Sequence, residues 1–161
     1  MTQAAKIDAS FNKIARIQDL DDLAAALFPG NRRHQHAFAA MFFVLKWSDG
    51  VVADLHRCVL AHGVSTRVFE RARAKMRRLG LIDHVSRFNQ KHGYREGWVL
   101  SNRFETSLEN LIKRVQDLKA TTGENRREKD RFAVELLGAR STTSDDNDEA
   151  VAHNSEASPS R

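Results

Sequence analysis

VVADLHRCVLAHGVSTRVFERARAKMRRLGLIDH, residues 51–84, predicts a helix, a tight turn and a second helix. Gly63 interrupts the first apolar run, and Ser65 is a residue type that often caps the start of a helix. Gly80 follows the last apolar position of the second run and suits a left-handed C-terminal cap. We therefore expect the second helix to run from Ser65 to Leu79.

A β-hairpin is predicted directly after this second helix. The stretches LIDHVSRF (81–88) and REGWVLS (95–101) are rich in β-branched and aromatic residues. A polar stretch that contains glycine separates them, as in the connection of a hairpin. The tip of the hairpin should span Asn89 to Tyr94. We expect Trp98, on the second strand, to pack against the helix of residues 65–79.

The remaining pattern gives a mainly α fold with a small β-hairpin and extra helices at both ends. HAFAAMFFVLKW, residues 36–47, is apolar almost all round and should lie at the centre. We expect an N-terminal helical extension (1–30) and a central domain (31–120). A charged linker with a weak helix around residues 132–137 (121–140) and a disordered acidic tail (141–161) should follow.

A seam of apolar residues begins just after the hairpin. Its members are spaced by four, three, four and three residues, which predicts an amphipathic helix. The seam is barely two heptads long, so covering the domain's own core is favoured over a coiled coil. A homodimer through the same seam is left open. The seam consists of Phe104, Leu108, Leu111, Val115 and Leu118.

Charge is distributed unevenly along the chain, whose formal net charge is +5. Residues 65–95 carry nine basic and two acidic residues, a local charge of +7, whereas residues 141–161 carry −4. Within residues 65–79 six bases accompany one acid, although a solvated helix more often interleaves both signs. The simplest interpretation of this excess of bases is a solvated cationic face. The preceding turn and the basic hairpin favour a polyanionic partner instead.

The order of helix, turn, helix and hairpin resembles the winged helix-turn-helix of bacterial and archaeal DNA-binding regulators. The resemblance spans residues 32–101 and includes the RAKMRRLGLI exit from the second helix. In that family the recognition helix enters the major groove, and the wing reaches a neighbouring groove or phosphate. The resemblance implies that base edges face Thr66, Arg67, Glu70, Arg71 and Ala74. It implies that backbone phosphates or the minor groove meet Arg78, Arg87, Lys91, His92 and Arg95.

Two of the predicted contacts have further interpretations. Ser65, as the cap, should leave backbone N–H groups pointing outward, where a phosphate can also bind. Glu70 is equally expected to pair with Arg67 or Arg73 as to accept from a cytosine amino group.

These features predict sequence-specific binding of double-stranded DNA, as in a transcriptional regulator. The alternatives are a DNA-binding accessory in replication or segregation of a plasmid, phage or other mobile element, and a winged-helix module that binds protein or RNA. No nucleophile elbow, phosphate loop or HExxH motif occurs, so we expect no enzyme and no cofactor. The spacing of His34, His36, His56, Cys58 and His62 fits no zinc signature, so we expect no metal.

The compartment follows from two further features. One cysteine and no apolar run of membrane-spanning length predict a cytoplasmic protein without a membrane partner, associated with the nucleoid when bound to DNA.

Overall fold

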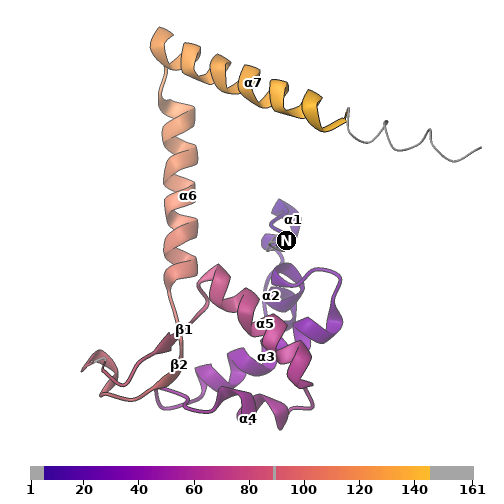
Figure 1. Cartoon of the computed structure of the whole chain (residues 1–161), viewed down its shortest axis with the longest axis vertical. Coiled ribbons are helices and arrows are strands. Elements are labelled where there is room, and N and C mark those ends of the chain that lie inside the picture. The colour runs from indigo at the N-terminus through magenta and orange to yellow at the C-terminus, as the bar shows by residue number, and fades with distance from the viewer. Residues whose placement is uncertain (1–5, 89, 146–161) are drawn as a thin grey trace, which may run out of the picture. The chain divides into compact units, whose positions relative to one another are not determined.

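The computed structural model describes residues 6–88 and 90–145 and is mainly helical with a small antiparallel sheet (Figure 1). By their contacts the residues divide into two units, Met1–Asn110 and Leu111–Arg161. The first unit begins with α1 (Phe11–Ile14) and α2 (Leu20–Leu27). The N-terminal extension is therefore helical in two short segments.

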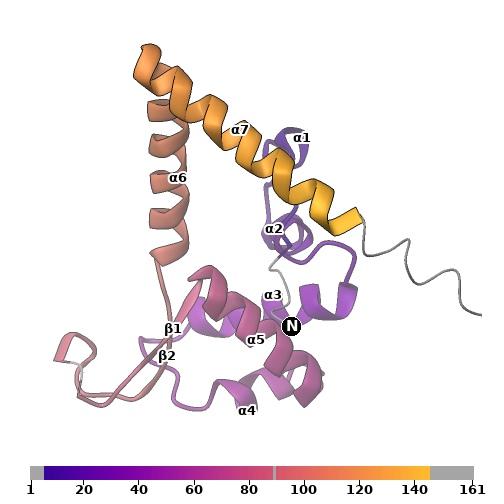
Figure 2. The ribbon, with the colours of Figure 1, turned by 45° about the horizontal axis from the view of Figure 1, so that its top comes forward.

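Helix α3 (Arg32–Lys46) lies at the centre of the first unit. It begins after Asn31, whose side chain accepts a hydrogen bond from the His34 backbone N–H. It packs against α2, α4 and α5 (Figure 2), and Phe38 and Met41 are fully buried. The expectation that this apolar run forms the centre is confirmed.

The helix, turn and helix expected in residues 51–84 are present. Helix α4 (Leu55–Leu60) follows Asp54, whose carboxylate accepts from the Arg57 N–H, and α5 spans Thr66–Leu79. Helix α4 starts later than the apolar run suggests, because Val52 is drawn into a bridge with Trp98. The Val52 N–H donates to the Trp98 carbonyl, and the Trp98 N–H donates back, both at 2.9 Å.

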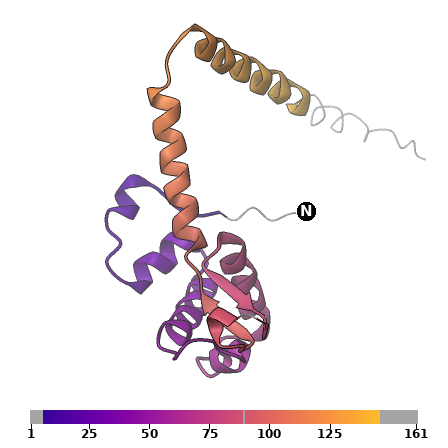
Figure 3. The same ribbon diagram turned by 90° about the vertical axis from the view of Figure 1, so that its left-hand side faces the viewer.

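The expected hairpin consists of β1 (Ile82–Val85) and β2 (Gly97–Leu100), which lie side by side in Figure 3. Its register pairs His84 with Trp98. A short 3-10 turn, η1 (Gln90–His92), lies within the predicted tip. Asn89, the first residue of that tip, lies outside the described residues.

Gly80, which caps the end of α5, lies against the start of α6 (Arg103–Ala120). Its φ of +85° is left-handed, and its carbonyl accepts from the Phe104 N–H at 3.1 Å. A Cβ at this position would lie 3.0 Å from the Arg103 Cβ. The close approach fixes the first turn of α6 beside the exit of α5.

The seam of α6 behaves differently from the prediction that it covers the domain's core. Phe104 packs against the core, whereas the later seam residues, Leu108, Leu111, Val115 and Leu118, are exposed. The prediction is therefore wrong beyond the first turn. The anchor at Gly80 holds only that turn, and a helix of this length extends about 27 Å.

Helix α7 (Glu124–Asp145) replaces the expected linker and weak helix. Ion pairs at i,i+4 spacing, such as Arg126–Asp130 at 3.0 Å, favour the helix despite its sparse apolar content. The helix also includes residues 141–145, so the prediction of a disordered tail is wrong for these five residues. The rest of that tail, residues 146–161, lies outside the described part of the chain.

Candidate nucleic-acid interface

The two faces of α5 differ sharply in burial. Phe69, Ala72 and Met76 are buried against the core. The predicted contact residues on and before the helix are all exposed. The fold therefore leaves a polar, largely cationic face of α5 open to a ligand. These exposed residues are Ser65, Thr66, Arg67, Glu70, Arg71, Ala74 and Arg78.

The first turn of α5 is positioned by α4 rather than by its cap. Ser65 is the N-cap, but its hydroxyl makes no capping hydrogen bond. Thr66 Oγ1 lies 3.3 Å from His56 Nε2, and the His56 ring centroid lies 4.9 Å from that of Phe69. A histidine from α4, itself packed on a core aromatic, thus contacts the Thr66 hydroxyl.

Glu70 has a partner within its own helix. Its carboxylate forms an ion pair with Arg73, one turn later. The Arg73 guanidinium also lies 5.0 Å from the Trp98 ring centroid and 5.3 Å from that of Phe69. The predicted pairing of Glu70 with Arg73 is therefore present, and the reading of a cytosine by Glu70 stays a prediction. Trp98 packs beside α5, as expected, through Arg73.

Lys75 contributes little to the exposed basic face. Its ammonium donates to the carbonyl oxygens of Lys6, at 2.5 Å, and Leu27, and lies 4.5 Å from the centroid of the Phe28 ring. Burial, and secondarily the nearby Arg78, lowers the pKa of Lys75. This base ties the N-terminal extension to α5.

The hairpin presents the predicted wing residues around its tip. Arg87, Lys91 and Arg95 are exposed, and His92 is partly exposed. Two aromatic side chains accompany them: Phe88 is 80% exposed and Tyr94 is 63% exposed. The Arg87 guanidinium lies 5.5 Å from the centroid of the Phe88 ring. The hairpin thus combines exposed cations with aromatic surface.

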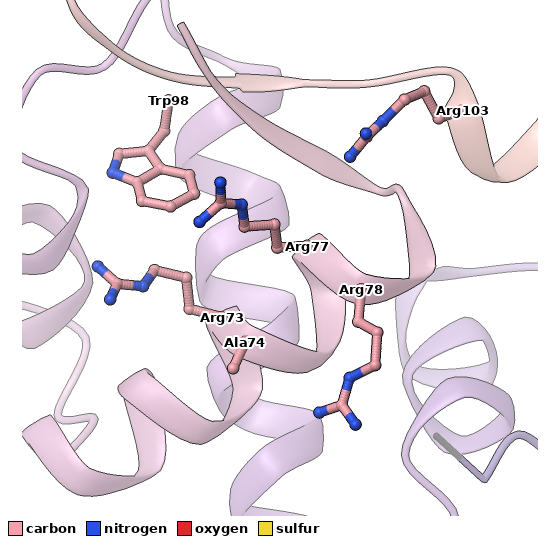
Figure 4. A pocket seen from close by; sticks show the side chains of 6 residues that line it. All are labelled: Arg73, Ala74, Arg77, Arg78, Trp98 and Arg103. Atoms are coloured by element: carbon pink, nitrogen blue, oxygen red, sulfur yellow. The ribbon is translucent and has the colours of Figure 1, made fainter. Parts of the chain in front are cut away.

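A cationic pocket lies between α5, β2 and the start of α6 (Figure 4). Its volume is about 470 Å³. Three of its arginines are not among the predicted contacts. Two of these, Arg73 and Arg77, lie one turn apart on α5, a spacing that the sequence could have revealed. The third, Arg103, lies there because Gly80 contacts the first turn of α6. The sequence pattern does not reveal this contact. The pocket is lined by Arg73, Ala74, Arg77, Arg78, Trp98 and Arg103.

Comparison with known proteins identifies no relative: no family model, curated protein or solved structure matches this chain. Any function assigned to the site therefore has to rest on its own residues. Within residues 6–88 and 90–145, no helix is both long and apolar enough to cross a membrane. In the same part of the chain, no three His, Cys, Asp or Glu side chains gather as metal ligands.

Proposed function

We propose that this chain is a winged helix-turn-helix protein that binds double-stranded DNA sequence-specifically and regulates transcription. The observation that carries the proposal is the exposed cationic face of α5 beside a cationic hairpin. Both belong to one unit whose core is built by α3, α4 and α5. An α-helix fits the major groove of B-DNA, and a basic surface gains affinity by releasing counterions from phosphates.

Base reading is assigned to the first two turns of α5. Arg67 and Arg71 are exposed and lie one turn apart, and arginine is suited to bidentate contact with guanine. Phosphate contact is assigned to the hairpin, whose Arg87, Lys91 and Arg95 surround a glycine-containing tip. Charge without a fixed geometry contributes affinity rather than discrimination between bases.

The alternatives make different predictions for ligand choice. A replication or segregation accessory of a mobile element would share the same duplex-binding surface and differ only in its target sites. A module that binds RNA or protein would prefer those ligands to duplex DNA at equal ionic strength. Ligand competition therefore separates the classes of partner, and the genomic position of the bound sites separates the biological roles.

The proposal is tested by selecting duplexes from random DNA and measuring their affinity by fluorescence anisotropy. Arg67→Ala and Arg71→Ala should each weaken binding to the selected duplex by about 1–3 kcal/mol, with a smaller loss on random DNA. Arg16→Ala, which removes an exposed cation far from α5 in the sequence, is the matched control. A wild-type protein that prefers RNA or an acidic protein to every duplex would overturn the proposal.

We also propose that a second copy of the chain covers the exposed seam of α6. Leu111 is 59% exposed and Ile112, which borders the seam, is 56% exposed. In heptad terms Leu108 and Val115 occupy a positions, and Leu111 and Leu118 occupy d positions. Ile112 then falls at an e position, where an apolar side chain is more stable packed against a partner helix than exposed to solvent.

Charge favours an antiparallel arrangement of the two α6 helices. A parallel pair would place Arg114 opposite the partner's Lys119 at both edges, which is repulsive. An antiparallel pair that matches Leu111 with Val115 would bring Glu105 opposite Lys119 at both ends, with Ile112 near its own copy. Its single like-charge contact would be between the two Arg114 side chains.

Analytical ultracentrifugation of the full chain tests this arrangement. Leu111→Asp should abolish dimers, whereas Val134→Asp, at an exposed position of α7, should not. Lys119→Glu should weaken an antiparallel dimer, and adding Glu105→Lys should restore it. If Lys119→Glu strengthens association, the helices pair in parallel. A wild-type chain that stays monomeric at high concentration would refute the dimer.

A further inference from the structure

The pocket between α5, β2 and α6 has an unusual lining. Four of its six residues are arginines, the fifth is Trp98, and no carboxylate lines it. In Figure 4 Arg73 and Arg77 extend toward Trp98. Neighbouring cations repel one another, and an anion would relieve the repulsion that nearby carboxylates leave uncompensated. The pocket is therefore suited to a negatively charged ligand.

The partners of the individual arginines show where the free positive charge lies. Arg73 is paired with Glu70, and Arg103 Nη2 lies 2.5 Å from Asp83 Oδ1. Both carboxylates lie outside the lining, so they offset these charges without occupying the pocket. Among the residues that the structure describes, Arg77 has no ion-pair partner. Arg77 is therefore the cation best placed to bind an incoming anion.

The chemistry of the lining favours a phosphate group. Guanidinium groups donate paired hydrogen bonds that match phosphate oxygens, and Ala74 adds only a small side chain to the lining. The pocket also adjoins the proposed DNA-binding face, because Ala74 and Arg78 belong to both. A phosphate held here would therefore lie beside the bases that α5 is proposed to read.

We propose that this arginine pocket binds a backbone phosphate of the DNA duplex, with Arg77 and Arg103 as its ligands and Trp98 as its wall. The inference rests on the proposed function, because it assigns a duplex to the neighbouring face of α5. It adds three residues to the interface: Arg77 of α5, Trp98 of β2 and Arg103 of α6. Their role is to fix the position of α5 in the groove.

Trp98 allows the pocket to be observed directly. The chain has two tryptophans, so Trp47→Phe leaves Trp98 as the only one. Trp47 is 70% exposed, which makes this change mild. In that background, duplex DNA should change the Trp98 emission. Adding Arg77→Gln and Arg103→Gln should remove the change, whereas adding Arg16→Gln should leave it intact.

Salt dependence provides the second measurement. The two pocket substitutions together should lower the slope of log K against log salt by about 2, equally on selected and random duplexes. Arg77→Gln alone, which breaks no ion pair, should lower it by about 1 and leave the thermal melting temperature unchanged. This single variant keeps the test valid if the loss of the Arg103–Asp83 pair unfolds the chain.

The outcomes separate this inference from the proposed function. If the wild type binds duplex DNA but Arg77→Gln changes neither slope nor Trp98 emission, the pocket assignment is wrong and the proposed function stands. If no duplex binds, the proposed function fails. A Trp98 response to inorganic pyrophosphate that depends on Arg77 would then identify a site for a free phosphate and overturn the assignment to the DNA backbone.

Discussion

Replacing Gly97 by alanine should disrupt the attachment of the hairpin to the rest of the fold. Gly97 has a φ of +151°, and an added Cβ would overlap the Val52 carbonyl oxygen and lie 2.7 Å from its carbon. Both neighbours are backbone atoms, so no side chain can move aside. Strand β2 would have to separate from Val52, and the two hydrogen bonds between Val52 and Trp98 would break.

The expected loss can be built from these contributions. Two backbone hydrogen bonds contribute about 1 kcal/mol each. A side chain in a backbone region that favours glycine adds about 2 kcal/mol. Gly97→Ala should therefore lower the free energy of unfolding by about 4 kcal/mol, a large part of the roughly 5–15 kcal/mol of a typical domain.

Gly93→Ala is the matched control in the same hairpin. Gly93 also has a positive φ, of +63°, but nothing lies within 4 Å of its added Cβ. Its cost should be about 1 kcal/mol, from backbone strain alone. Urea denaturation followed by circular dichroism measures both variants. Equal losses for Gly93→Ala and Gly97→Ala would refute the close approach of β2 to Val52.

Three further predictions concern charge. Neutralising Lys91 and Arg95 together should lower the salt slope of duplex binding by roughly 2, and an unchanged slope would place the hairpin tip off the DNA. The pKa of His34 is lowered by partial burial and by two nearby cations. The unfolded chain therefore takes up this proton first, and stability should fall as the pH drops below about 6.5; melting temperatures that fall equally for wild type and His34→Gln between pH 7.5 and 5.5 would contradict this. Deleting residues 146–161, which are mostly acidic among their charged positions, should tighten duplex binding at low ionic strength and leave it unchanged at high ionic strength. No tightening at low salt would exclude masking of the basic face by this segment.

The helix, turn, helix and hairpin were predictable because local chemistry decides them. Gly80 adopts the left-handed conformation expected of a C-terminal cap, and the apolar spacing of α5 alone separates its buried face from its exposed face. The aromatic and β-branched residues at Trp98 and Val99 likewise predict a strand. The exposed positions of Arg67 and Arg71 follow from the same helical period.

Features that depend on contacts distant in sequence escaped prediction. The bridge between Val52 and Trp98 is a single pair without a pattern of its own. Arg103 reaches the pocket only because Gly80 admits the first turn of α6. Lys75 is of a residue type that often contacts DNA, yet its ammonium is bound by carbonyl groups of the N-terminal extension. In each case the sequence indicates the residue type but not its partner.

The charge available to a polyanion is consequently smaller than the +7 of residues 65–95. Lys75 is bound to two carbonyl groups, and Arg73 is paired with Glu70. If Arg67 and Arg71 read bases, the phosphate contacts left on the proposed surface number about six, which sets a salt slope near −5. The six are Arg77, Arg78, Arg87, Lys91 and Arg95, together with Arg103, which lies outside residues 65–95 and is counted as a proposed phosphate ligand although it is paired with Asp83. A much steeper slope would require Lys75 to leave the N-terminal extension, and binding would then loosen the contact that holds the extension to α5.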